Sequence, residues 1–97
     1  MRVISVKTLR DFWQKHPDSE SALRAWYTEA KKASWRSPQD IKTAYRSSSI
    51  LRNSRAVFNI KGNTYRLVVA VKYEFQLVYV RFVGTHGAYD KIDAEKI

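Results

Sequence analysis

The chain has 97 residues, no cysteine, 44% hydrophobic residues and a formal net charge of +9. A chain of this size and apolar content is expected to fold as one packed domain, residues 1–97, and not to be disordered. The composition excludes disulfides, thiolate metal sites and a membrane-spanning apolar run, and it favours a cytoplasmic location.

The first third of the chain is predicted to be helical after a short strand at residues 2–5. Apolar residues recur at helical spacing in residues 6–16, and Pro17 ends this helix. A second helix repeats the spacing, with Asp18 as its expected cap. The residues of the two stripes are Leu9, Phe12, Trp13, His16, Leu23, Trp26, Tyr27 and Ala30. We expect a helical hairpin whose stripes pack on one face of a sheet.

A short third helix is signalled by the sequence Ser-Pro-Gln-Asp at residues 37–40. Near Ile50 the apolar period changes from 3.6 to two, which predicts strands. The expected strands are an extended segment at 50–52, then 56–60, 64–73 and 77–83, with a hairpin turn at 61–63. The predicted fold class is α+β: an N-terminal strand, a helical hairpin and a short third helix packed on an antiparallel β-sheet.

The alternation of side chains assigns a face to each strand residue. In residues 64–73 the odd positions are bulky and should meet the helices, whereas the even positions are smaller. In the last strand, Val78, Val80 and Phe82 are expected to point inward. The opposite, outward face is expected to carry Asn59, Lys61, Arg66, Tyr79 and Arg81. Residues after Gly84 should leave the sheet and form a short final helix near that face.

The positive charge is concentrated in residues 41–89. This half holds eight basic residues and one acid, whereas the remainder holds ten basic and eight acidic residues. The clustering favours nucleic acid as the partner, and a merely basic surface is the plainer interpretation. No cofactor is expected, and no metal site, because two distant histidines without paired carboxylates do not form one.

The outward face carries groups suited to RNA chemistry. Arg66 and Arg81 can bind a phosphodiester and stabilise extra charge in a transition state. Tyr89 can stack on a base, and His86 can exchange a proton near neutral pH. Each residue also has a plainer interpretation, because an outward arginine often only keeps a strand soluble and His86 can be a helix-capping or loop residue.

The opening residues 1–5, the hairpin 59–68 and the ending 84–92 together resemble the HigB toxins of bacterial toxin–antitoxin systems, within the RelE-like superfamily. The resemblance implies a ribosome-dependent endoribonuclease that enters the ribosomal A site and cuts mRNA there without metal. It also implies a HigA-type antitoxin with a helix-turn-helix domain, and contact with operator DNA only through the toxin–antitoxin complex.

The resemblance also implies roles for individual residues. Arg66 matches the mid-sheet phosphate-binding arginine, and Lys61 and Arg81 match the family in kind and face. His86 and Tyr89 lie in the region of the C-terminal catalytic groups, and the general base stays open between His86, Tyr89 and a lysine. The expected catalytic residues are Arg66, Arg81, His86 and Tyr89. The expected RNA-binding residues are Asn59, Lys61, Arg55, Lys72 and Lys91.

Two other functions remain open at this point. One is a non-catalytic nucleic-acid-binding module that uses the same basic face, and the other is a protein whose basic face holds an acidic partner. For a toxin, the antitoxin is expected to contact mainly the helical side and to block the A site sterically, although direct covering of the cationic face is the alternative.

Overall fold

The computed structural model describes residues 1–97, whose five strands form one open sheet in the order β1-β5-β4-β3-β2. The strands are β1 (Arg2–Ile4), β2 (Ser49–Leu51), β3 (Arg55–Ile60), β4 (Tyr65–Lys72) and β5 (Leu77–Thr85). Strands β5 to β2 are antiparallel neighbours, as predicted, and β1 adds a parallel edge beside β5. The α+β class is confirmed, with a mixed sheet.

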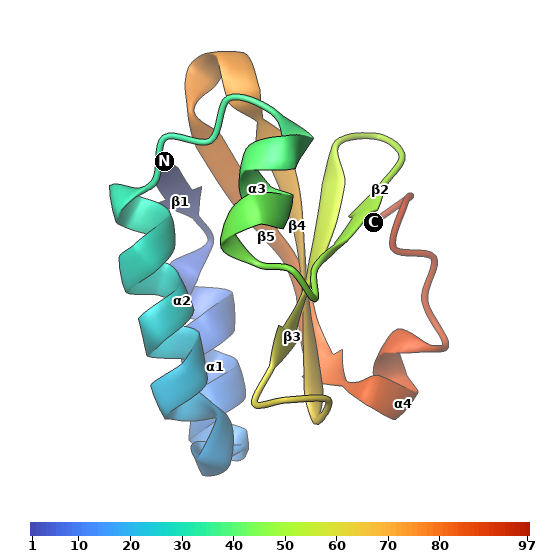
Figure 1. The fold of residues 1–97 in the computed structure, drawn as a ribbon. Coiled ribbons are helices and arrows are strands. Elements are labelled where there is room, and N and C mark those ends of the chain that lie inside the picture. Colours follow the sequence, from blue (N-terminus) through green and yellow to red (C-terminus); the bar gives the residue numbers. More distant parts are fainter.

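The helices are α1 (Val6–Lys15), α2 (Glu20–Lys32), α3 (Pro38–Ala44) and α4 (His86–Tyr89). Two 3-10 turns complete the set, η1 (Pro17–Ser19) and η2 (Tyr73–Phe75). Figure 1 shows α1 and α2 side by side on one side of the sheet, with α4 and the last residues of the chain on the other. No helix is long and apolar enough to cross a membrane.

The main core lies between the helices and the sheet. The predicted stripes supply buried residues from α1 and α2, among them Leu9 and Leu23, both fully buried. They join Phe58 and the odd positions of β4 in a cluster of 16 buried residues. The Trp26 and Phe58 rings meet edge to face with their centroids 5.4 Å apart. The predicted helical hairpin and the inward face of β4 are therefore confirmed.

A second, smaller cluster covers part of the opposite face of the sheet. Val57 of β3 and Val68 of β4 pack there against Ala94. Partly buried residues complete the cluster: Leu51, Phe82, Tyr89, Ile92 and Ile97. The C-terminal segment, residues 90–97, therefore lies over the face that sequence periodicity leaves open to solvent.

A β-bulge in β5 changes the facing of its last residues. Val69 pairs with Val80 and Val68 pairs with Phe82, so that Arg81 is an extra residue between them. A bulge of this kind interrupts the alternation of side chains. Phe82 consequently packs in the second cluster and not with Val78 and Val80, and the prediction of an inward Phe82 is wrong.

Candidate functional site

A row of paired residues crosses β3, β4 and β5 near one end of the sheet, on the face opposite the helices. Arg66 of β4 pairs with Asn59 of β3 on one side and with Gly84 of β5 on the other. The Arg66 guanidinium donates hydrogen bonds to the carbonyl oxygens of Asn63 and Tyr65, at 3.1 and 3.2 Å. Because arginine carries five N–H donors, this half-buried group still has donors for a phosphate.

Because Gly84 has no side chain, the ring of Phe82 fills the space above it, beside Arg66. A Cβ placed on Gly84 would lie 2.5 Å from Cζ of Phe82, which is too close for two carbon atoms that are not bonded to each other. The glycine therefore lets the ring lie flat against β5, where it continues the second cluster toward the row.

Helix α4 lies at the same end of the sheet as Arg66. The Thr85 hydroxyl caps the helix by accepting a hydrogen bond from the amide of Ala88 at 3.1 Å. The His86 amide donates to the carbonyl of Thr64, the residue before β4, at 3.3 Å. The connection fixes the start of α4 next to the start of β4, so Arg66, His86 and Tyr89 belong to one end of the sheet, as predicted.

The two candidate proton-transfer groups on α4 differ in exposure. The His86 side chain is 57% exposed, with Nε2 3.7 Å from Oδ1 of Asp90. Tyr89 is half-buried and packs against the second cluster. Sequence reasoning gave Asp90 no role. The four-residue spacing of His86 and Asp90 is the signal that would have found it, since such residues are neighbours on a helix.

Arg81 points outward, as predicted, but it does not lie next to Arg66. It is exposed at the bulge, and its guanidinium carbon lies 5.5 Å from the centroid of the Tyr79 ring. It precedes Gly84 by three positions, which is about 10 Å along a strand. The predicted convergence of four residues is therefore partial, because Arg81 and Tyr79 form a separate cationic position farther along β5.

Lys61 lies on the other side of the sheet from Arg66, and the predicted facing is wrong. Its Nζ lies 2.8 Å from Oδ2 of Asp18, and the Tyr65 hydroxyl donates to Oδ1 of the same carboxylate at 2.6 Å. Lys61 follows the last residue of β3 and has a left-handed backbone conformation, so the alternation of side chains along the strand no longer applies to it. We call Asp18, Lys61 and Tyr65 the Asp18 clamp, because they join η1 to the β3–β4 turn.

The Asp18 clamp also corrects the predicted helix cap. Asp18 lies within η1, Ser19 precedes α2, and no side chain caps that helix. The hydrogen bonds from Lys61 and then from Tyr65 lower the pKa of Asp18. The hydrogen bond to Asp18 in turn raises the pKa of Tyr65.

Arg55 contacts the C-terminal segment and is only partly exposed to solvent. Its Nε donates to the main-chain oxygen of Ile97 at 2.8 Å, and its Nη1 donates to the carbonyl of Asn53 at 2.7 Å. Glu95 is held nearby, since its carbonyl accepts from the Asn53 side chain at 3.0 Å. The structure thus uses Arg55 to hold residues 95–97 against the sheet.

The remaining predicted RNA-binding residues are spread over the face. Lys72 is exposed at the far end of β4, about 20 Å from Arg66 at the rise of a strand. Lys91 is exposed directly after α4. Asn59 lines a shallow depression of about 360 Å³ whose lining has no apolar residue. Its other lining residues are Ser47, Gly62 and Asn63.

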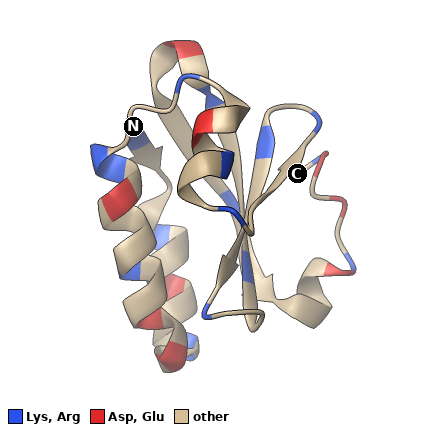
Figure 2. Ribbon diagram, in the orientation of Figure 1, with Lys and Arg blue, Asp and Glu red and all other residues tan.

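The end of the sheet thus offers an arginine for a phosphate, amides and a hydroxyl for sugar or base edges, and a histidine for proton transfer. Figure 2 shows cationic residues along the strands of the sheet. No group of three or more histidine, aspartate or glutamate side chains is placed to hold a metal ion.

The family described as HigB_toxin, RelE-like toxic component of a toxin-antitoxin system, matches residues 19–92. The mRNA interferase toxin HigB of Escherichia coli is 33% identical over 92 residues, which are 93% of this chain and 88% of the relative. The mRNA interferase HigB of Shigella flexneri matches to the same extent. The mRNA interferase HigB of another Escherichia coli strain is 24% identical over 95% of this chain and 91% of its own length.

Proposed function

Because this chain belongs to the HigB family of RelE-like toxins of toxin–antitoxin systems, we propose that it is an endoribonuclease that cuts translated mRNA on the ribosome. One observation supports this most directly: Arg66 lies on the central strand β4, near the end of the sheet where α4 carries His86 and Tyr89. Residues 1–97 would act as one toxin domain, in the cytoplasm where ribosomes translate.

The proposed cleavage uses the nucleophile that RNA carries. The 2′-oxygen forms a bond to the adjacent phosphorus while the bond from phosphorus to the 5′-oxygen breaks. A base on the toxin takes the 2′-hydroxyl proton, and an acid gives a proton to the leaving 5′-oxygen. Arg66 holds the phosphate and stabilises its extra charge. The base is His86, Tyr89 or a lysine, and Asp90 would orient the His86 imidazole.

The other proposed RNA contacts extend from this centre. Asn59 would bind a sugar or base edge beside Arg66, since it lines the polar depression. Arg81, Lys72 and Lys91 would attract neighbouring phosphates, because all three are exposed cations. Lys61 and Arg55 would contribute indirectly, by holding the β3–β4 turn and the C-terminal segment.

Ribosome dependence follows from the open form of the site. Arg66 and an exposed His86 bind an RNA strand without forcing the in-line geometry, whereas ribosome-held mRNA arrives positioned. Positioning can contribute about 7–11 kcal/mol in favourable reactions. The test compares cleavage of naked mRNA with cleavage of mRNA on programmed ribosomes, read as new 5′ ends. Equal rates on both substrates would contradict the proposal.

The proposed partner is a HigA-type antitoxin with a helix-turn-helix domain, encoded by the adjacent gene. Operator DNA would be bound only through the toxin–antitoxin complex. The antitoxin would silence the toxin by covering the helical side and excluding it from the A site. Coexpression of the adjacent gene product tests this, because it must restore growth of cells that express the toxin.

A second candidate function is binding of RNA without cleavage. The observation that favours it is the exposure of His86, whose imidazole lies beside Asp90 and not beside Arg66. Mapping of mRNA 5′ ends after induction separates the two functions. New ends that disappear in Arg66→Ala and in His86→Ala support cleavage, whereas growth arrest without new ends supports binding alone.

A further inference from the structure

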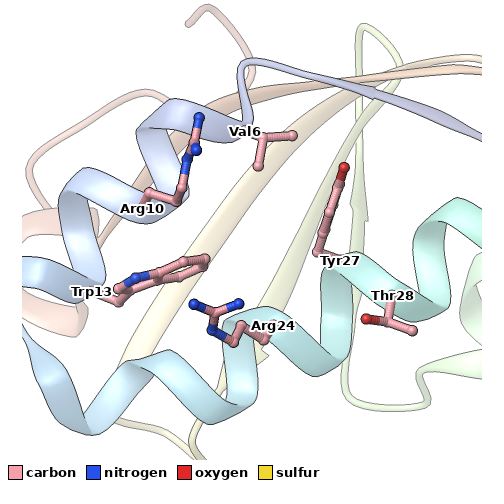
Figure 3. Close-up of a pocket in the computed structure, with 6 residues that line it drawn as sticks. All are labelled: Val6, Arg10, Trp13, Arg24, Tyr27 and Thr28. Atoms are coloured by element: carbon pink, nitrogen blue, oxygen red, sulfur yellow. The ribbon is translucent and has the colours of Figure 1, made fainter.

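A groove lies between α1 and α2 on the helical side of the molecule. Its volume is about 540 Å³, within the range of ligand pockets. Figure 3 shows the six residues that line it: Val6, Arg10, Trp13, Arg24, Tyr27 and Thr28. Three come from successive turns of α1 and three from α2, so the groove follows the seam of the helical hairpin.

The polar groups of this lining are hydrogen-bond donors without an acid among them. Arg10 has no carboxylate partner, and Arg24 donates to Glu20 at 2.7 Å, outside the lining. The hydroxyl groups of Tyr27 and Thr28 make no hydrogen bond within the protein. The groove therefore suits a group that accepts hydrogen bonds and carries negative charge.

The acids of the helical half are already engaged. The five acids before residue 45 each accept a hydrogen bond from another group of the protein: Asp11, Asp18, Glu20, Glu29 and Asp40. Arg10, Lys31 and Lys32 have no such partner. The helical side is mixed in sign along the sequence, but the charges that line the groove, Arg10 and Arg24, are both positive.

The aromatic rings of the groove do not offer faces for RNA bases. The Arg24 guanidinium lies 4.7 Å from the centroid of the Trp13 ring, and Trp13 is only 8% exposed. Lys31 covers the Tyr27 ring at 5.1 Å. Single-stranded RNA binding relies on free aromatic faces along a basic track. A groove whose aromatic rings are covered in this way fits a peptide better than RNA.

We propose that the α1–α2 groove binds an acidic segment of the antitoxin, with a carboxylate between Arg10 and Arg24 and an apolar side chain against Val6. This inference rests on the proposed function, since it assigns a site to the antitoxin. Charge complementarity at such an interface sets which partner binds and how fast it associates. The groove lies on the side of the sheet opposite Arg66, so binding there leaves the cationic face untouched.

The experiment measures affinity for the adjacent gene product with three toxin variants. Arg10→Glu reverses a charge in the groove, and Thr28→Trp fills the groove without changing charge. Lys15→Glu is the matched control, because it makes the same reversal on α1 outside the lining. The first two should weaken binding about tenfold or more, the size of one important contact, and Lys15→Glu should change it by about twofold or less.

Growth arrest provides the second measurement. All three variants should still arrest growth without the antitoxin, which shows that they fold, and the two groove variants should escape neutralisation. Equal loss of affinity from Arg10→Glu and Lys15→Glu would overturn the site in favour of diffuse attraction. Unchanged affinity in both groove variants would overturn it as well, and weakened ribosome binding alongside would assign the groove to RNA.

The wild-type protein separates failure of this inference from failure of the proposed function. If the adjacent gene product neither binds nor neutralises the wild-type chain, the proposed partner and the groove assignment are both wrong. If it neutralises the wild-type chain and the groove variants equally, only the groove assignment is wrong.

Discussion

Nζ of Lys61 lies 2.8 Å from Oδ2 of Asp18, which joins the turn between the two long helices to the turn between β3 and β4. The Tyr65 hydroxyl binds the other oxygen of the carboxylate at 2.6 Å. On the opposite face of the same turn, Asn63 accepts a hydrogen bond from Arg66. The Asp18 clamp therefore holds the turn that contacts the proposed phosphate-binding arginine.

The Asp18 clamp predicts the pH dependence of stability. The pKa of Asp18 is lowered from its ordinary 3.8, so the ionised carboxylate stabilises the folded state above that value. This stability is lost as the pH falls through the lower folded-state pKa. Urea unfolding from about pH 7 to about pH 2 should therefore show a shallower acid decline in Asp18→Asn than in the wild type.

The raised pKa of Tyr65 predicts how the stability of the fold depends on pH in the alkaline range. Its pKa is raised from 10.0, so its contribution is complete below that value and is lost as the pH rises through the folded-state pKa. Asp11→Asn is the control in both the acid and the alkaline range, because Asp11 forms an exposed pair with Lys7 on one helix. An acid decline that changes equally in Asp11→Asn and Asp18→Asn would contradict a special role for the clamp.

Arg66→Ala is predicted to abolish growth arrest while the domain stays folded. Loss of one preorganised donor at a transition-state charge typically costs about 100- to 1,000-fold in rate. The paired control replaces Lys31 and Lys32 with alanine, which removes more charge far from the sheet face and should leave toxicity nearly unchanged. Induced cultures and circular dichroism measure the two properties, and equal loss of toxicity from both changes would show that net charge alone matters.

Gly84→Ala is predicted to destabilise the protein by about 1–3 kcal/mol, the usual cost of overpacking. The added Cβ would lie 2.5 Å from the Phe82 ring, which is packed in the second cluster and must move. Gly87→Ala is the matched control, since a Cβ there meets nothing within 4 Å and helix α4 tolerates alanine. Urea midpoints that fall by the same amount in both variants would rule out this contact as the cause.

Arg55→Ala is predicted to loosen the C-terminal segment without unfolding the sheet. The variant loses the hydrogen bonds from the guanidinium to Ile97 and Asn53. Amide hydrogen exchange should then become faster at Lys96 and Ile97, whose amides bond to Asp93, and stay slow in β4. Unchanged exchange in residues 95–97 would show that the second cluster holds the segment alone.

The sequence predicts most of the elements because their signals are local. The stripes of α1 and α2 and the alternation of β4 each repeat within one segment, and they correctly place Leu9, Leu23 and Leu67 in the core. The same alternation correctly places Asn59 and Arg66 on the opposite face, where the structure pairs them. Their roles in RNA cleavage remain predictions.

The facing of Phe82 and Lys61 could not be obtained from alternation. One extra residue in β5 opposite Val68 and Val69 turns Phe82 to the other face. A left-handed backbone at Lys61 directs its side chain to Asp18. Both departures are changes of backbone geometry at a single residue. The alternation of apolar and polar residues is a property of a whole strand, so it does not reveal such local changes.

The sequence by itself determined the helical hairpin, the strand-rich second half, the excess of positive charge and the resemblance to HigB toxins. Only the tertiary structure decided which cations remain free. Lys61 binds Asp18 across 43 residues and Arg55 binds Ile97 across 42 residues, whereas Arg10 keeps no partner. The physical reason is that periodicity reports on neighbours within an element, while ion pairs and hydrogen bonds depend on how distant elements pack together.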